Sequence, residues 1–316
     1  MKARALLSVT VVATTLALAA CSSSADTSAT TARAPAALSA ESSSAACPVT
    51  PVATTVSVDQ WGDIVSALGG DCAQVTTVLQ NSSVDPHDYE PTTGDIATFT
   101  NAQLVVVNGA DYDPWAEKAI ATLPNQPTLV SAAQVNNIAE GANPHLWYGP
   151  DYVQATADVV TAAFKTLAPG AASYFDQRKA AWQKSMTPYF DEIAAIKAGA
   201  AGKSYGATEG IFDYMADALG LVNVTPQGYQ NAAAAESDPA PGDVFAFNQA
   251  LSDKKMDVLI YNTQTEGSVP EQIRASAQTA GVPVVNVTET VAPGFDSFEA
   301  WQVSQLKDLA TALAVS

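Results

Sequence analysis

Short apolar runs alternate with amphipathic stretches along most of residues 47–316. The runs are rich in β-branched residues and have the length of buried strands, whereas the stretches between them repeat apolar side chains every three or four positions, as helices do. We therefore predict strands at residues 52–58, 75–79, 104–107, 128–130, 204–208, 222–224, 258–261 and 284–287. Strands that alternate with helices predict an α/β fold with parallel sheets covered on both faces.

Helices are predicted between these strands from start and stop signals. Asp59 is expected to cap the first helix, and Pro114 to open another. Further helices are predicted at residues 151–168, 211–219, 244–251, 271–280 and 298–314. Residues 228–242 are rich in Ala, Asp and Pro and are interpreted as a loop.

One amphipathic stretch is much longer than the others and covers residues 169–199. Its apolar positions are Phe175, Trp182, Met186, Tyr189, Ile193 and Ile196. A helix of this length would measure roughly 40 Å, and Pro188 is expected to kink it because proline removes a backbone donor. The pattern predicts two β/α lobes, at residues 47–168 and 200–316, joined by this single long helix.

Composition and charge limit the classes of function. The 316 residues suit two domains, and the hydrophobic content of 47% is sufficient for a substantial core. The formal charge of −18 argues against nucleic-acid binding, because no basic patch offsets it. An acidic surface raises the local concentration of cations without selecting any one of them.

Residues 1–21 have the features of a bacterial lipoprotein signal. Lys2 and Arg4 precede an apolar region, and the segment 18–21 (LAAC) matches a lipobox in which Cys21 would be acylated. Residues 22–46 are almost all Ser, Ala and Thr, which predicts a disordered tether. We therefore expect a protein held by a lipid anchor at the extracytoplasmic face of the membrane.

The remaining cysteines, Cys47 and Cys72, form an even pair in an oxidising compartment. A disulfide is expected at the amino edge of the first sheet, where both cysteines precede strands. Two buried free thiols are the alternative.

Only two histidines occur, and each follows a proline. His87 lies in the segment 85–91 (DPHDYEP), and His145 lies in the segment 143–148 (NPHLWY). Imidazole is the commonest metal ligand, so this repeated setting favours a metal site over two unrelated turn residues.

Two acidic residues follow strands at the edge where parallel sheets bind their ligands. Glu209 comes after the strand at 204–208, and Glu289 comes after the strand at 284–287. Each has an ordinary explanation when taken alone, Glu209 as a helix N-terminal acid and Glu289 as a surface loop acid.

With these motifs, residues 47–316 resemble the metal-binding solute-binding lipoproteins of zinc and manganese ABC importers, a ZnuA/TroA-like family. The resemblance implies His87, His145, Glu209 and Glu289 as ligands in a cleft between two lobes, and an ABC permease as partner. Glu289 departs from the family's usual Asp, and the segment 147–150 (WYGP) departs from its Trp-x-Asp-Pro pattern.

The donor set of two imidazoles and two carboxylates suits Mn²⁺ or Zn²⁺, with Fe²⁺ as a third candidate. Asp85 or Glu90 is expected to accept the second imidazole N–H. If four ligands from both lobes close the site, the ion would be the only strong bond across the cleft. The function expected is therefore capture and delivery of a metal by a monomeric, non-enzymatic protein.

Two other functions stay open. A secreted metal-dependent hydrolase would use one Glu as general base, although no His-Glu-x-x-His motif is present. A surface adhesin is the second, and no residue separates it from transport.

Overall fold

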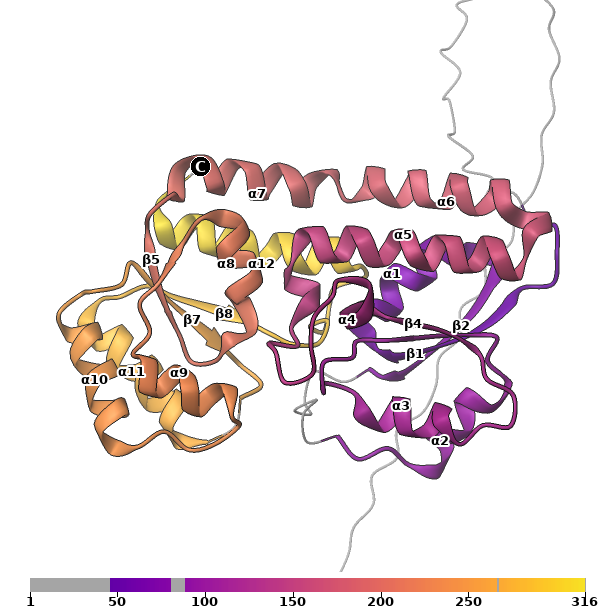
Figure 1. The fold of residues 1–316 in the computed structure, drawn as a ribbon. Helices are drawn as coiled ribbons and strands as arrows, with labels where there is room; N and C mark the ends of the chain where they lie inside the picture. The colour runs from indigo at the N-terminus through magenta and orange to yellow at the C-terminus, as the bar shows by residue number, and fades with distance from the viewer. Residues whose placement is uncertain (1–45, 81–88, 266, 316) are drawn as a thin grey trace, which may run out of the picture. The chain divides into compact units, whose positions relative to one another are not determined.

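The computed structural model describes residues 46–80, 89–265 and 267–315, which form two four-stranded sheets (Figure 1). The first sheet has the order β2-β1-β3-β4 and contains β1 (Val52–Val58), β2 (Ala73–Leu79), β3 (Leu104–Val107) and β4 (Thr128–Ser131). The second has the order β6-β5-β7-β8 and contains β5 (Ser204–Ala207), β6 (Val222–Asn223), β7 (Val258–Asn262) and β8 (Val284–Val287). All neighbouring strands are parallel, which confirms the predicted α/β fold.

The two sheets share one topology. In each, the second strand of the chain lies on one side of the first, and the third and fourth lie on the other. The direction of winding therefore reverses between β1 and β3 and again between β5 and β7. Ligands of open parallel sheets bind outside the carboxyl ends of the strands at such a reversal.

Helices cover both faces of each sheet, because a strand buried on both sides needs apolar partners above and below. The helices of the first half are α1 (Asp59–Gly69), α2 (Thr93–Thr98), α3 (Pro114–Ala121), α4 (Ala132–Val135) and α5 (Pro150–Leu167). Those of the second half are α8 (Asp213–Leu219), α9 (Gln227–Ala234), α10 (Pro241–Ser252), α11 (Ser268–Ala280) and α12 (Phe298–Leu313). Strands β3 and β7 are buried along their whole length.

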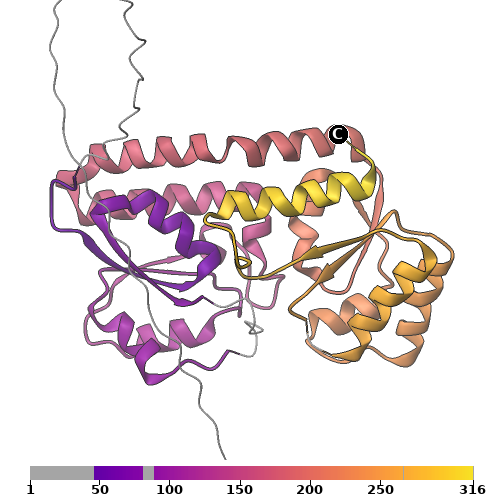
Figure 2. The same cartoon turned by 180° about the vertical axis from the view of Figure 1, so that it is seen from behind.

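Two consecutive helices, α6 (Ala172–Ser185) and α7 (Thr187–Ala200), run along both halves, as Figures 1 and 2 show. Helix α6 packs against α1 and α5, and α7 packs against α8 and α12. Met186 separates them, two residues before Pro188, which occupies the first turn of α7. The predicted connector is therefore present as one long bent helix, interrupted where proline cannot donate the next backbone hydrogen bond.

A continuous core joins the halves. The Tyr148 ring packs edge-on against Phe212 and Trp301 at centroid distances of 5.4 and 6.0 Å. The Tyr148 hydroxyl donates to the Thr288 carbonyl at 2.8 Å, and the Phe298 N–H donates to Asp63 Oδ2 at 2.6 Å. The expectation that a metal would be the only strong bond between the halves is wrong, because buried aromatic and polar contacts already connect them.

Two local predictions are also wrong. Residues 228–242 are not one loop, since α9 occupies most of the first part and α10 begins at Pro241. Tyr229 of α9 is buried and packs at 4.8 Å against Phe247, so tertiary contact stabilises a short Ala-rich helix. Asp59 is the first residue of α1 rather than its cap, and its carboxylate accepts the Val291 N–H at 3.3 Å instead.

Cys47 and Cys72 are joined by a disulfide with a Cα–Cα distance of 5.0 Å. Residue Cys72 immediately precedes β2, and Ala73 pairs with Val52 at the start of β1, so the bond lies at the amino edge of the first sheet. Within the described ranges, no helix is both long enough and apolar enough to cross a membrane.

Candidate metal centre

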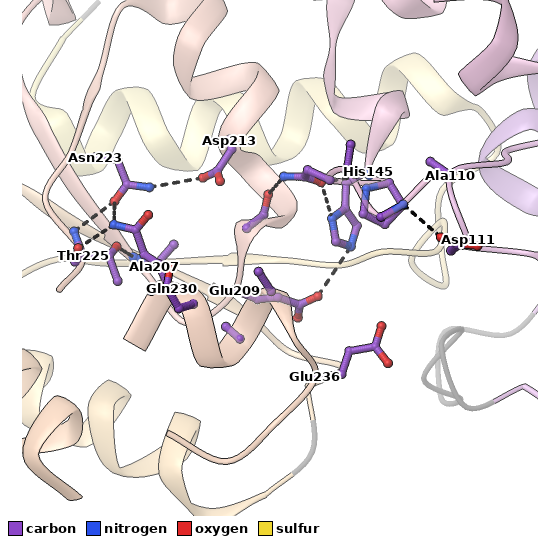
Figure 3. A pocket seen from close by; sticks show the side chains of 18 of the residues that line it. Ala110, Asp111, His145, Ala207, Glu209, Asp213, Asn223, Thr225, Gln230 and Glu236 are labelled. Atoms are coloured by element: carbon purple, nitrogen blue, oxygen red, sulfur yellow. Dashed lines mark hydrogen bonds and ion pairs between the residues drawn. The ribbon is translucent and has the colours of Figure 1, made fainter. Parts of the chain in front are cut away.

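Side chains that follow carboxyl strand ends in both sheets converge at one point. His145 lies in the connection between β4 and α5, Glu209 lies two residues after β5, and Glu289 lies two residues after β8. One ligand atom from each residue lies within 4.8 Å of the other two. Figure 3 shows the His145 ring and the Glu209 carboxylate directed at one another. These three residues form the candidate metal centre.

The orientation of the His145 ring is set by Asn143. Asn143 Oδ1 lies 2.8 Å from His145 Nδ1 and also accepts the His145 backbone N–H at 3.0 Å. The Asn143 amide nitrogen donates to the Gly210 carbonyl at 2.6 Å, which fixes the amide with its oxygen towards His145. Because an amide oxygen only accepts, Nδ1 carries the proton and Nε2 presents its lone pair to the carboxylates.

Both carboxylates approach His145 Nε2 from the second sheet. Glu209 Oε1 lies 3.5 Å from this nitrogen, and Glu289 Oε2 lies 3.8 Å from it. A cation among these three atoms would be attracted by two negative charges and one lone pair. The arrangement therefore suits a borderline divalent ion that accepts both nitrogen and oxygen ligands.

Hydrogen bonds hold each carboxylate from behind. Asn262, the last residue of β7, donates from Nδ2 to Glu209 Oε2 and to Glu289 Oε1, both at 2.8 Å. Thr265 Oγ1 donates to Glu209 Oε2 at 2.6 Å. Gln264 Oε1 accepts the Glu289 backbone N–H at 2.7 Å, which fixes the loop after β8.

Tyr112 connects the first half of the chain to Glu289. Its hydroxyl donates to Glu289 Oε2 at 3.1 Å and accepts from Gln60 Nε2 at 3.1 Å. Burial, reinforced by the Glu289 charge, raises the pKa of the Tyr112 hydroxyl well above its ordinary value. Tyr112 therefore remains a protonated donor at any physiological pH.

The centre is shielded from water on the side of the first sheet. His145 is 4% exposed and Glu289 is 0% exposed. The Trp147 and Tyr112 rings lie edge-on to the imidazole at centroid distances of 5.4 and 6.1 Å. Such surroundings strengthen the attraction between a bound ion and its ligands, because few water molecules screen it.

A cavity of about 330 Å³ reaches His145 and Glu209. Its other lining includes the carboxylates of Asp111, Asp213 and Glu236 (Figure 3). An acidic opening of this kind attracts cations towards the centre.

The structure brings together three of the four predicted ligands, His145, Glu209 and Glu289. His87, Asp85 and Cys21 lie outside the described residues, so their predicted roles stay predictions. Glu90 is exposed, and its predicted support of an imidazole also stays a prediction.

Sequence reasoning missed Asn143, Asn262 and Tyr112. Asn262 could have been found, because it ends a strand at the same edge as the predicted acids. Asn143 and Tyr112 carry no comparable signal, since their roles depend on contacts between segments far apart in the chain.

Comparison with known proteins places the chain among metal-binding proteins. The family model described as "ZnuA: Zinc-uptake complex component A periplasmic" matches residues 53–312. The iron-binding protein YfeA of Yersinia pestis is 25% identical over 248 residues, which are 74% of this chain and 77% of that protein. The high-affinity zinc uptake system protein ZnuA of Bacillus subtilis is 24% identical over 234 residues, or 67% of this chain and 71% of that protein.

A solved structure shows the same fold. The periplasmic zinc-binding protein TroA from Treponema pallidum aligns with a TM-score of 0.70 at 18% sequence identity. The alignment covers 84% of this chain and 99% of that one, so both sheets and the bent helix belong to the shared architecture.

Proposed function

We propose how this protein binds its metal ion, since the chain belongs to the ZnuA family, the metal-binding solute-binding components of zinc, manganese and iron ABC uptake systems. The protein captures one divalent transition metal ion through His87, His145, Glu209 and Glu289. The observation that carries this proposal is the convergence of three ligand atoms within 4.8 Å of one another, from segments that follow strands in both sheets. His87 is included among the ligands on the basis of its sequence motif alone, because it lies outside the described residues.

The ion is Zn²⁺ or Mn²⁺, with Fe²⁺ as a third candidate. Two imidazoles and two carboxylates satisfy a tetrahedral Zn²⁺, and their oxygen atoms also suit Mn²⁺ and Fe²⁺. The curated relatives support this range, since one is named as iron-binding and another as a zinc uptake protein.

Metal-induced stabilisation tests the ligand set. A ligand that binds only the folded protein stabilises it by about 2.7 kcal/mol at a hundredfold excess over its dissociation constant. Thermal unfolding of the wild type should therefore shift upward with Zn²⁺ or Mn²⁺, whereas His87→Ala, His145→Ala and Glu289→Ala should lose the shift. The shift should also shrink at acidic pH, because protons compete with the metal for the imidazole nitrogens.

The matched control is Glu236→Ala, which removes an acid of the same cavity that lies outside the group of three ligands. This variant should keep nearly the full shift. A full shift in Glu289→Ala would show that the ion does not bind where the two halves meet.

Members of this family are non-enzymatic transport components, which sets aside the hydrolase alternative. The protein would hand its metal to an ABC permease and act as a monomer. The two β/α lobes at residues 47–168 and 200–316, joined by the connector at 169–199, would hold the metal between them.

The family is periplasmic, that is, extracytoplasmic. We propose that Cys21 carries a lipid and that residues 22–46 tether the folded part to the membrane. Cys21→Ser should move the protein from the membrane fraction to the soluble fraction and abolish labelling by a fatty acid. Ser23→Ala is the matched control and should leave both unchanged.

A further inference from the structure

We propose that Asn262 is a positioning residue that limits each acidic ligand to one oxygen and so favours ions of low coordination number. The inference rests on the proposed function, because it concerns how Glu209 and Glu289 would bind the ion. It adds a residue that is not itself a ligand and that acts on metal selection.

The Asn262 side chain is fixed in one orientation. It is 1% exposed, and its Oδ1 accepts the Gln264 backbone N–H at 3.0 Å. The amide nitrogen must therefore face the other way, towards Glu209 and Glu289. A flipped amide would place its oxygen against two carboxylates and lose the bond from Gln264.

Both amide hydrogens are committed to the acidic ligands. One bond runs to Glu209 Oε2 and the other to Glu289 Oε1, each at 2.8 Å. The oxygens that face His145 Nε2 are the opposite ones, Glu209 Oε1 and Glu289 Oε2. Asn262 thus holds one oxygen of each carboxylate and leaves the other directed at the centre, where Glu289 Oε2 also accepts the Tyr112 hydroxyl.

Bidentate binding, in which both oxygens of a carboxylate contact the ion, would require each carboxylate to turn towards the ion. That rotation would break its bond to the buried Asn262 side chain, and hydrogen bonds to a charged carboxylate are among the strong ones. For Glu209 it would also break the 2.6 Å bond from Thr265. Monodentate binding, through one oxygen of each carboxylate, keeps all of these bonds.

The consequence is selection among divalent ions. One oxygen from each acid, beside His145 Nε2, gives the ion few oxygen ligands, which suits the four-coordinate geometry that Zn²⁺ adopts readily. Mn²⁺ prefers more oxygen ligands, which two-oxygen carboxylates would supply. Asn262 should therefore favour Zn²⁺ over Mn²⁺ beyond the general affinity order.

The test compares wild type, Asn262→Ala and Gln230→Ala. Gln230 is a matched control, because it is an amide that lines the adjacent cavity and donates to Thr225 rather than to a metal ligand. Two quantities are measured for each protein: the visible spectrum with Co²⁺, which absorbs intensely when four-coordinate, and the Zn²⁺ and Mn²⁺ dissociation constants by competition titration.

Wild type and Gln230→Ala should show the intense four-coordinate Co²⁺ bands. Asn262→Ala should lose them, and its preference for Zn²⁺ over Mn²⁺ should fall by about tenfold, which matches the strength of one charged hydrogen bond. If the Ala variant does not fold, Asn262→Leu keeps the side-chain size while removing the donor without adding a charge, and the same losses are expected.

The inference is overturned if wild type shows weak, higher-coordinate Co²⁺ bands, or if both Asn262 variants keep the wild-type spectrum and metal preference. These results differ from failure of the proposed function, in which wild type would bind none of Co²⁺, Zn²⁺ and Mn²⁺ and the inference would fall with it.

Discussion

Replacing Asp59 by Asn should change how the stability of the protein depends on pH. Asp59 begins α1, and its Oδ1 accepts the Val291 N–H from the segment that follows β8. Burial raises the pKa of the Asp59 carboxyl from 3.8 to about 7, because the backbone hydrogen bonds that favour the charged form only partly offset desolvation.

The direction in which the free energy of unfolding changes with pH follows from proton binding at Asp59. Between pH 3.8 and about 7 the folded protein binds a proton at Asp59 that the unfolded chain has released. The free energy of unfolding therefore decreases as pH rises through this window. The full pKa difference corresponds to roughly 4 kcal/mol, of which about 3 kcal/mol falls between pH 5 and pH 8. Asn cannot ionise but keeps the acceptor oxygen for Val291, so the variant should lack this contribution.

The assay is urea unfolding of the metal-free protein, kept so by a chelator, at several values between pH 5 and pH 8. The free energy of unfolding of the wild type minus that of Asp59→Asn should fall by about 3 kcal/mol across the range. Asp257→Asn is a control, because bonds from Ser204 lower the pKa of the Asp257 carboxyl and place its titration below this range. A wild-type minus Asp59→Asn difference that is constant, or that rises with pH, would refute the reasoning.

Three further predictions concern other parts of the molecule. Reducing the Cys47–Cys72 disulfide should lower the free energy of unfolding by about 3 kcal/mol, measured by urea unfolding with and without reductant. Tyr148→Phe removes the buried hydroxyl that bonds the Thr288 carbonyl and should cost about 1–3 kcal/mol in the same assay. Glu209→His replaces an oxygen ligand by nitrogen and should shift competition between Zn²⁺ and Mn²⁺ towards Zn²⁺, whereas unchanged competition would mean that Glu209 is not a ligand.

Local patterns in the sequence determined the architecture of this protein. Strand β7 is a continuous apolar run because both its faces are buried, and α6 and α7 show helical periodicity because one side packs on neighbouring helices. Residues at strand ends were likewise predictable, since parallel strands bring their carboxyl ends to one edge. Glu209 and Glu289 could be proposed as neighbours on that ground before any contact was known.

Only the tertiary structure decided what surrounds those side chains. Helix α9 is stabilised by Tyr229 packing on Phe247, and composition alone favoured a loop there. Asp59 bonds Val291, which is far away in the chain, instead of capping its own helix. Asn262 touches both acids because β7 lies between β5 and β8 in the sheet. Periodicity and capping are properties of neighbours along the chain, whereas these contacts depend on which distant segments meet when the sheets and helices pack together.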